Sequence, residues 1–459
     1  MRAGGGEICA TRIFPRLPQI VRAPHDGNMN TNQASNGPTP TISRVCPDGT
    51  LIETLYDPVA ATTTLAVCTP DGTTSAVAHL DLSTGERLIP YSPQNNLMAS
   101  GCVLLPGEIG DFGDKGDLVE AVQAFIHRYV DLTPAFEEIA AHYVLLTWVY
   151  DAFSELGYLR FRGDYGTGKT RALLTIGSVC HKPFFASGAS TVSPIFHVLD
   201  TFGGTLVLDE ADLRFSDATA ELTKILNNGN VAGMPVLRTM TNRHRELNPQ
   251  AFNVFGPKLI GMREHFQDRA LESRFLTEET GQRPLRPDIS IHLPSAMRDE
   301  ARALRNRLLA WRFRARHQVA IDPGRLVPGI APRLNQTALA LLSIVDDEHL
   351  RERIARELVG EEARVLTERA SSAEATVLAG LVRAAASSST HIALSSIADH
   401  MVTREASLSP KSVGSILRTK LRLPTVKSHG VYVVPGTARP AITALAKRYG
   451  IETEQTASE

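Results

Sequence analysis

The chain has 459 residues, 43% of them hydrophobic, which is enough material for about three domains with packed cores. Its 48 Lys and Arg residues nearly balance 49 Asp and Glu residues, so the net charge of −1 says nothing about partners, and the distribution of charge along the chain says more. The five cysteines lack C-x-x-C spacing, and no apolar run is long enough for a transmembrane helix or a signal peptide. We expect a multidomain cytoplasmic protein with reduced thiols, no structural zinc and no membrane partner.

Two segments precede any helical pattern. Residues 1–44 are rich in Gly, Asn, Pro, Thr and Ser and predict a disordered tail, within which Met29 is an alternative start. Residues 45–106 contain β-branched runs separated by P-D-G turns at 47–49 and 70–72, which predict a small β-rich element. Nothing in this element indicates its function.

Helical patterns begin after an acidic linker. Residues 118–132 place apolar side chains on one helix face, whereas residues 139–153 are apolar almost all round and predict a buried helix with Trp148 in the core.

A phosphate-binding loop follows in the sequence GYLRFRGDYGTGKTRALLTI, residues 157–176. A short strand leads into a glycine-rich loop and then directly into a helix, which is the context that the G-x-x-x-x-G-K-[ST] motif requires. Backbone N–H groups and the helix N-terminus favour phosphate oxygens, Lys169 reaches the β and γ phosphates, and the Thr170 hydroxyl holds Mg²⁺. The predicted nucleotide-binding residues are Gly163, Asp164, Tyr165, Gly166, Thr167, Gly168, Lys169 and Thr170. The sequence therefore predicts binding of ATP or GTP with Mg²⁺.

A second acidic motif, GGTLVLDEAD, occupies residues 203–212. Residues 205–208 predict a strand buried in a parallel sheet, with Asp209 and Glu210 at its carboxyl end, where open α/β sheets bind ligands. We expect Asp209 to bind Mg²⁺ together with Thr170, and Glu210 to polarise the attacking water. The second carboxylate indicates hydrolysis, because nucleotide binding alone does not need it.

A helix over TAELTKILNNGN and then a hairpin are predicted next. Residues 234–239 and 252–261 are typical of strands, and the basic turn between them carries Arg243, His244 and Arg245. These side chains either contact nucleic-acid phosphates or belong to an ordinary solvated turn.

The phosphate loop, the D-E pair, the hairpin and DRALESRFL (268–276) together resemble the AAA+ ATPase module over about residues 140–350. The chain resembles the branch with a hairpin before sensor 1, which contains the mini-chromosome-maintenance and superfamily-three helicases. It resembles still more closely uncharacterised ATPase domains of mobile elements found beside primases. The likeness implies ATP and Mg²⁺ as cofactors and a hexameric ring.

The resemblance assigns three further arginines. Arg274, in the S-R-F string, would act as an arginine finger on the γ-phosphate of a neighbouring subunit, or else pairs with Glu272 or Glu278. Arg263 stands where those helicases have a polar sensor-1 residue, commonly Asn, which puts the water-positioning geometry in doubt. Arg333 is the candidate for sensor 2, or else a solvated arginine on an amphipathic helix.

Two basic regions follow. Residues 298–316 contain seven arginines on a predicted amphipathic helix, which either pairs with acidic neighbours or binds nucleic acid. Residues 371–450 predict three helices and a strand pair, similar to a winged-helix domain. Nine Lys and Arg residues lie between residues 404 and 448, with Glu405 as the single acidic residue. The expected DNA contacts are Lys411, Arg418, Lys420 and Lys427, unless this domain binds a protein or packs as a lid.

The predicted fold is therefore α/β: an AAA+ P-loop core (107–295) with a parallel sheet flanked by helices and a pre-sensor-1 hairpin, a helical lid (296–370), a winged helix (371–450) and a disordered tail (451–459). The leading functional prediction is a hexameric ATP-hydrolysing DNA helicase or translocase in replication of a mobile genetic element, with a primase or polymerase as a possible partner. The alternatives are a DNA-bound loader or regulatory ATPase without unwinding activity, and a protein-remodelling ATPase whose winged helix binds an adaptor.

Overall fold

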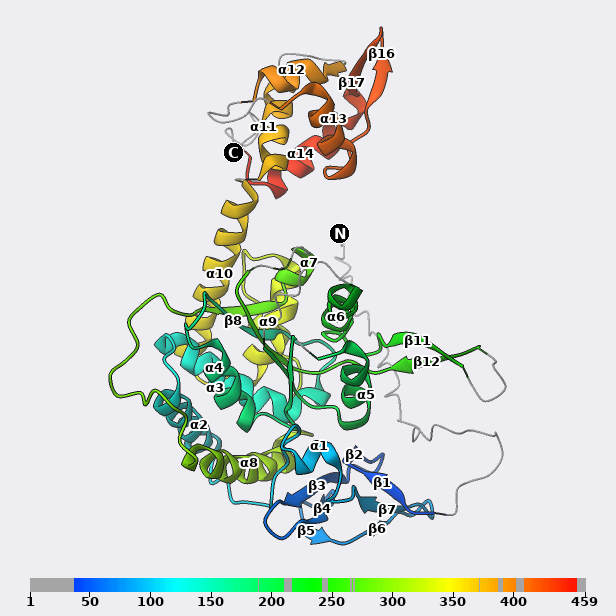
Figure 1. Cartoon of the computed structure of the whole chain (residues 1–459). Helices are drawn as coiled ribbons and strands as arrows, with labels where there is room; N and C mark the ends of the chain where they lie inside the picture. The colour runs from blue at the N-terminus through cyan, green and yellow to red at the C-terminus, as the bar shows by residue number, and fades with distance from the viewer. Residues whose placement is uncertain are drawn as a thin grey trace, which may run out of the picture. The chain divides into compact units, whose positions relative to one another are not determined.

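The computed structural model describes residues 37–188, 190–209, 217–241, 247–264, 266, 269–370, 372–386, 391–401 and 408–451. They form two compact units, in a mixed α/β architecture (Figure 1). The first unit extends to Arg325 and also takes Gln336–Asp346, whereas the second unit comprises Leu326–Asn335 and the chain from Asp347 onward. Within the described ranges, no helix combines the length and the hydrophobicity that a membrane crossing needs.

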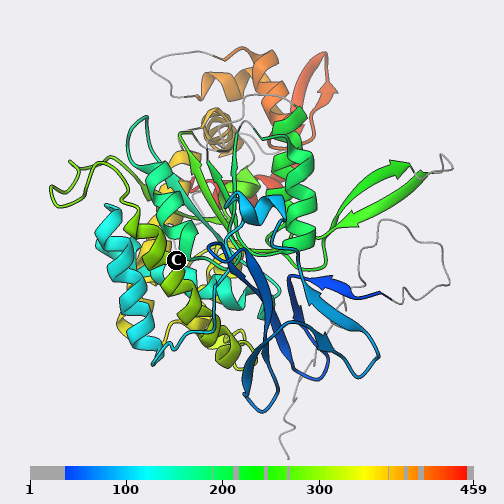
Figure 2. The same cartoon turned by 60° about the horizontal axis from the view of Figure 1, so that its bottom comes forward.

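A β-rich element opens the first unit, drawn in blue in Figures 1 and 2. Its sheets have the strand orders β2-β3-β4-β5 and β1-β7-β6. The strands are β1 (Thr39–Thr41), β2 (Ser43–Val45), β3 (Leu51–Asp57), β4 (Thr62–Cys68), β5 (Thr74–Val77), β6 (Leu80–Asp81) and β7 (Arg87–Pro90). Gly49 and Gly72 have φ of 94° and 86° and complete the two P-D-G turns, because glycine adopts positive φ without steric cost.

The predicted end of the N-terminal tail is wrong. Strands β1 and β2 begin at Thr39 and Ser43 and pair with β7 and β3, so ordered structure starts before residue 44. Residues 1–36 of the predicted tail, like residues 452–459 at the other end, lie outside the described residues.

Five parallel strands form the central sheet in the order β14-β8-β13-β10-β9. They are β8 (Tyr158–Arg162), β9 (Phe184–Ser187), β10 (Leu206–Asp209), β13 (Lys258–Met262) and β14 (Phe275–Glu279). The buried strand predicted before Asp209 is confirmed as β10. Strand β13 lies between β8 and β10, so the ends of these three strands meet at one edge of the sheet, where open α/β sheets bind ligands.

Helices cover both faces of this sheet. Leu206 and Leu208 pack in one hydrophobic cluster with residues of α5 and α6. Val207 points to the opposite face, toward α4, where Gly177 leaves room for its side chain. The helices of the first unit are α1 (Asn96–Ala99), α2 (Lys115–Tyr129), α3 (Pro134–Val149), α4 (Lys169–Val179), α5 (Val192–Phe202), α6 (Asp217–Asn228), α7 (Arg269–Glu272) and α8 (Ala296–Ala315). The prediction of a buried second helix is confirmed: α3 is buried along its length, and Trp148 donates its ring N–H to the carbonyl of Val179 at 3.0 Å.

An antiparallel hairpin of β11 (Val236–Thr241) and β12 (Leu247–Phe252) precedes β13 and projects away from the sheet in both views (Figures 1 and 2). The single strand predicted over 252–261 is wrong. Phe252 ends the hairpin, the backbone N–H of Asn253 donates to the Asp200 carboxylate at 2.8 Å, and Gly256 at φ 154° breaks the run before β13. The arginines predicted at the hairpin tip, Arg243 and Arg245, lie outside the described residues.

Helix α8 corrects the predicted boundary of the helical lid. It belongs to the first unit, and its arginines make contacts inside that unit. Arg312 is buried, donates from Nε to Oε1 of Glu53 at 2.7 Å and from Nη1 to Oδ1 of Asp151 at 2.9 Å. Arg316 also donates to Asp151, at 2.8 Å. Some arginines of the predicted basic face therefore form ion pairs within the chain and are not available to a partner.

Glu53 of β3 is the centre of this buried network and is only 2% exposed. Burial raises its pKa, but His181, Lys182 and Arg312 outweigh burial and hold the pKa at about 2. Burial lowers the pKa of His181 to about 4, so this ring is neutral at neutral pH. The charge on Glu53 is then balanced by Arg312 and Lys182. The network joins the β-rich element to the turn that follows α4.

The second unit contains the predicted three helices and strand pair. Its elements are α10 (Glu348–Ala370), α11 (Ala373–Ala386), β15 (His391–Ala393), α12 (Leu394–Asp399), α13 (Pro410–Thr419), β16 (Val426–Ser428), β17 (Val431–Pro435) and α14 (Arg439–Arg448). Helix α9 (Pro332–Ile344) divides between the two units. As predicted, Ser409 caps α13 and Pro410 starts it. The sequence patterns missed β15, which completes a sheet of order β15-β17-β16, and α14.

Candidate functional site

The predicted phosphate loop joins β8 to α4 at the carboxyl edge of the sheet. Gly166 and Gly168 have φ of 73° and 94°, values that L side chains rarely adopt, so the loop requires glycine at both positions. Lys169 opens α4, and its ammonium group donates to the carbonyls of Gly163 at 2.7 Å and Asp164 at 2.5 Å. The loop thus wraps around the amino group that the motif assigns to phosphate.

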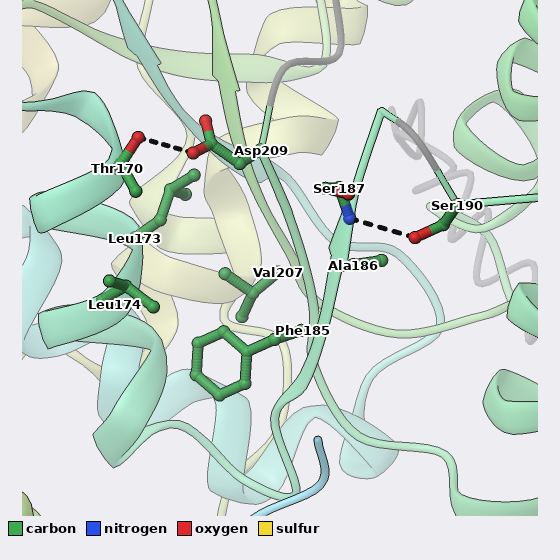
Figure 3. Close-up of a pocket in the computed structure, with 9 residues that line it drawn as sticks. All are labelled: Thr170, Leu173, Leu174, Phe185, Ala186, Ser187, Ser190, Val207 and Asp209. Carbon is green, nitrogen blue, oxygen red and sulfur yellow. Dashed lines mark hydrogen bonds between the residues drawn. The ribbon is translucent and has the colours of Figure 1, made fainter. Parts of the chain in front are cut away.

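Thr170 and Asp209 are brought together as the sequence predicted. The Thr170 hydroxyl donates to Oδ2 of Asp209 at 2.5 Å, from the first turn of α4 to the end of β10 (Figure 3). A hydroxyl and a carboxylate are the oxygen ligands that Mg²⁺ prefers, so this donor set suits the ion that the motif implies. Glu210, the predicted catalytic base, lies outside the described residues.

A cavity of about 300 Å³ adjoins this pair. Its walls are Leu173 and Leu174 of α4 on one side and Phe185 and Val207 of the sheet on the other, and Thr170 and Asp209 line its polar end (Figure 3). The cavity therefore continues from the candidate metal site along the apolar side of α4.

Two residues that the sequence reasoning missed shape the site. A Cβ atom on Gly261 of β13 would lie 2.7 Å from Oδ1 of Asp209 and 2.8 Å from Leu173, so this glycine makes room for the carboxylate. Thr280, directly after β14, forms a hydroxyl–hydroxyl hydrogen bond of 2.8 Å with Thr167, and its backbone N–H donates to the carbonyl of Arg162 at 2.6 Å. Thr280 thus supports the phosphate loop from β14, whereas Gly261 of β13 shapes the space around Asp209. No short motif indicates either residue, since both act across strands.

Arg263 follows β13 and so lies between the phosphate-loop strand and the Asp209 strand. Its guanidinium stacks over the ring of Tyr165 at 4.2 Å and donates to the Tyr165 hydroxyl. Two predicted nucleotide-binding residues are therefore in contact with each other, with Tyr165 76% exposed. Arg333 is half-buried in α9, in the part of that helix that belongs to the second unit.

Arg274, predicted to act as an arginine finger, is buried within its own chain in this structure. Arg274 directly precedes β14, at the amino ends of the parallel strands, whereas the phosphate loop lies at their carboxyl ends. Its side chain is only 7% exposed. The guanidinium donates to Oδ1 of Asn227 in α6, and the Arg274 carbonyl accepts the Tyr158 backbone N–H at 2.9 Å. In this position the guanidinium does not extend from the surface of the chain. The S-R-F string does not reveal this burial, because the partner is 47 residues away.

The predicted DNA contacts of the second unit are exposed. Lys411 and Arg418 lie on α13, Lys420 caps this helix, and Lys427 lies on β16. Residues 408–451 contain eight Lys and Arg residues and no Asp or Glu. This segment therefore supplies no carboxylate of its own to neutralise its positive charge.

No family model matches the sequence, and no curated protein matches it. Among solved structures, the fold is similar to an apo C-terminal region of NrS-1, at 11% identity and a TM-score of 0.36 over 84% of this chain and 96% of that chain. It is also similar to a full-length MCM homolog from Methanopyrus kandleri (12% identity, TM-score 0.34, 65% of this chain and 66% of that chain) and to the JCV helicase (14%, 0.24, 55% and 61%). Two of these names belong to the groups that the sequence motifs resemble. Because identity and TM-score are low, the function proposed below rests on the site itself.

Proposed function

We propose that this protein is an ATPase of the AAA+ type that acts on DNA. The observation that carries the proposal is the 2.5 Å hydrogen bond between Thr170 and Asp209 beside the glycine loop that encloses Lys169. This arrangement supports the phosphates and a divalent cation at one point.

The residues have distinct roles in the proposed reaction. Lys169 and the loop N–H groups bind the phosphates and hold the γ-phosphate for in-line attack. Thr170 and Asp209 would hold Mg²⁺, which would neutralise the charge that develops on the phosphate oxygens. Glu210 directs the attacking water and accepts its proton. Arg263, directly after β13, is the candidate for sensor 1, and Arg333 is the candidate for sensor 2.

The proposed action on DNA is that of a helicase or translocase, in replication of a mobile genetic element. Two features support it: the β11–β12 hairpin that precedes β13, as a pre-sensor-1 hairpin does, and the exposed basic residues of the second unit, which we interpret as a winged helix. The resemblance further implies a homo-oligomer, a hexamer. Arg274, which is buried within its own chain, is not part of this proposal.

Turnover of ATP by the purified protein tests the ATPase proposal. We expect Lys169→Ala and Asp209→Asn to abolish Mg²⁺-dependent phosphate release, and Glu210→Gln to bind ATP without turning it over. Lys224→Ala, which removes an exposed lysine of α6, serves as the matched control and should hydrolyse ATP at the wild-type rate. Wild-type turnover in Lys169→Ala would contradict the proposed site.

Gly261→Ala tests the geometry around Asp209. The added methyl group would meet the Asp209 carboxylate and Leu173, so we expect loss of turnover together with destabilisation of about 1–3 kcal/mol. The control is Gly360→Ala in α10, where an added Cβ meets nothing within 4 Å. Equal activity of the two variants would refute the role given to Gly261.

Stimulation of turnover by DNA distinguishes a helicase from a loader or regulatory ATPase, and particle size tests the oligomeric state. Strand displacement coupled to DNA-stimulated turnover supports a helicase, whereas DNA-stimulated turnover without displacement favours a loader or regulator. A rate of ATP hydrolysis that is unchanged by both single-stranded and duplex DNA would contradict the proposed action on DNA. Mass photometry with ATP and Glu210→Gln tests for a hexamer.

A further inference from the structure

The hairpin of β16 and β17 carries apolar side chains into solvent. Val426, Val431 and Tyr432 are 42%, 54% and 54% exposed, whereas Val433 and Val434 of the same hairpin are buried. The strands extend beyond the helices of their own unit (Figure 1). Exposed apolar side chains on a projecting element are typical of an interaction site. The strand register places Tyr432 on one face of the hairpin and Val426 and Val431 on the other, so the aromatic face is distinct from the valine face.

The register of the hairpin places an aromatic ring and a cation on one face. Lys427 is directly opposite Tyr432, and side chains two apart on a strand share a face, so both lie on the face of Val434. Val434 packs in one hydrophobic cluster with Leu417 of α13. Tyr432 and Lys427 therefore extend the face of the sheet that packs on the helices of this unit, and α13, which carries Lys411, contributes Leu417 to the same cluster.

The hairpin is held in a defined position. His429 and Gly430 have φ of 48° and 86°, the positive values of a tight two-residue turn. Arg418 of α13 donates from Nη1 to the hydroxyl of Thr425 at 2.9 Å, which ties the start of the hairpin to the helix. The ring of Tyr432 is thus presented from a fixed element, and little order has to be gained on binding.

The charge of the surrounding segment identifies the occupant. With eight Lys and Arg residues and no acidic residue over 408–451, this part of the chain attracts a polyanion. A ring beside a lysine provides a stacking platform for a base and a contact for its phosphate, which is the chemistry used to bind unpaired nucleotides. We propose that Tyr432 and Lys427 form a binding site for an unpaired nucleotide of a DNA strand, with the base on the ring and the phosphate at the ammonium group.

This inference specifies how the second unit binds DNA, and it rests on the proposed function in that respect. The test uses the full-length protein without added nucleotide, so that it does not depend on ATP turnover. Fluorescence anisotropy measures the affinity for labelled oligo(dT) and for a blunt duplex, and 2-aminopurine in the oligonucleotide reports stacking of a base. We expect Tyr432→Ala to weaken oligo(dT) binding roughly 5- to 150-fold and to abolish the 2-aminopurine signal, with a smaller loss for the duplex.

Conservative and opposite-face variants keep the test falsifiable. Tyr432→Phe should retain binding, because it keeps the ring, and Lys427→Ala should flatten the dependence of log affinity on log salt by about 0.7. Val431→Thr, which changes the other face of the hairpin, should bind like wild type. Unchanged oligo(dT) affinity in Tyr432→Ala overturns the inference, as does an equal loss in Val431→Thr.

Two further outcomes would overturn the inference. If Tyr432→Ala reduces self-association while DNA affinity is unchanged, the face joins copies of this chain and the inference fails. If oligo(dT) affinity depends on Lys411 and Lys420 but not on Tyr432, the second unit binds DNA without this nucleotide site. If the wild-type protein does not hydrolyse ATP, the proposed ATPase activity is contradicted, but the oligo(dT) binding test is unaffected.

Discussion

Helix α8 and the second unit both concentrate positive charge, but the structure uses the two groups of residues in opposite ways. Residues 298–316 contain seven arginines, of which Arg305, Arg312 and Arg316 are buried. The eight basic residues of 408–451 include Lys411, Arg418, Lys420 and Lys427, all exposed. Basic residues in similar number thus hold one unit together and form an external surface on the other.

The difference lies in the acidic partners. Arg312 meets Glu53 and Asp151, which are 259 and 161 residues away in the sequence. Segment 408–451 has no acidic residue. Local charge therefore indicates a nucleic-acid surface only where neither the segment nor the tertiary structure supplies carboxylates to neutralise it.

Removing Arg312, the buried arginine in the last turn of α8, should have the largest effect. Arg312→Ala leaves the buried carboxylate of Glu53 without its closest cation, and we expect a loss of about 3–5 kcal/mol in the free energy of unfolding, measured in urea. Arg314→Ala, an exposed arginine of the same helix, should cost within about 0.5 kcal/mol. Similar values for the two would break the distinction between buried and exposed charge.

Acid should release the same network. The pKa of Glu53 is about 2 in the folded chain against 4.5 for an ordinary glutamate, and that of His181 is about 4 against 6.5. Both folded values are depressed, so the unfolded chain binds more protons, and stability falls as the pH drops from about 6.5 through 2. The Glu53 share is roughly 3 kcal/mol. Thermal unfolding across this range measures the loss, and Glu53→Gln should remove the part below about pH 4.5. A flat profile would contradict the buried network.

Paired charge removals should distinguish the two regions in DNA binding. Replacing Lys411 and Lys420 by Ala should weaken binding to a duplex and reduce the slope of log affinity against log salt by about 2. Removing Arg298 and Arg314, two exposed arginines of α8, changes the net charge equally and should leave both quantities unaltered. If the α8 pair has the same effect, total charge rather than its placement governs binding.

The smallest expected effect separates positioning from charge. Arg418→Lys keeps the positive charge but loses the hydrogen bond to Thr425, which is worth about 0.5–1.5 kcal/mol. We expect a slight loss of stability and a DNA salt dependence like that of wild type. A salt slope as shallow as that of the Lys411 and Lys420 variant would contradict this separation.

The parts of the fold governed by local chemistry were predictable from sequence. The strand, glycine loop and helix around Lys169 follow from residue types at fixed spacing. The position of the Asp209 carboxylate follows from an apolar strand that ends in acidic residues. Gly261 and Thr280 were not predictable, because their roles arise only when neighbouring parallel strands align. The burial of Arg274 was not predictable for a similar reason: its motif is local, whereas its burial depends on Asn227 of α6.

The attachment of β3 to the interior through Glu53 limits how this protein can be dissected. Val103 forms a β-bridge with Phe184 of β9, and Ile42 belongs to the same hydrophobic cluster as β10. A fragment cut before β8 would therefore uncover a sheet edge and apolar side chains, and would leave Arg312 facing solvent where Glu53 had been. A minimal fragment that retains the phosphate loop should begin ahead of Thr39 and be shortened from the opposite terminus.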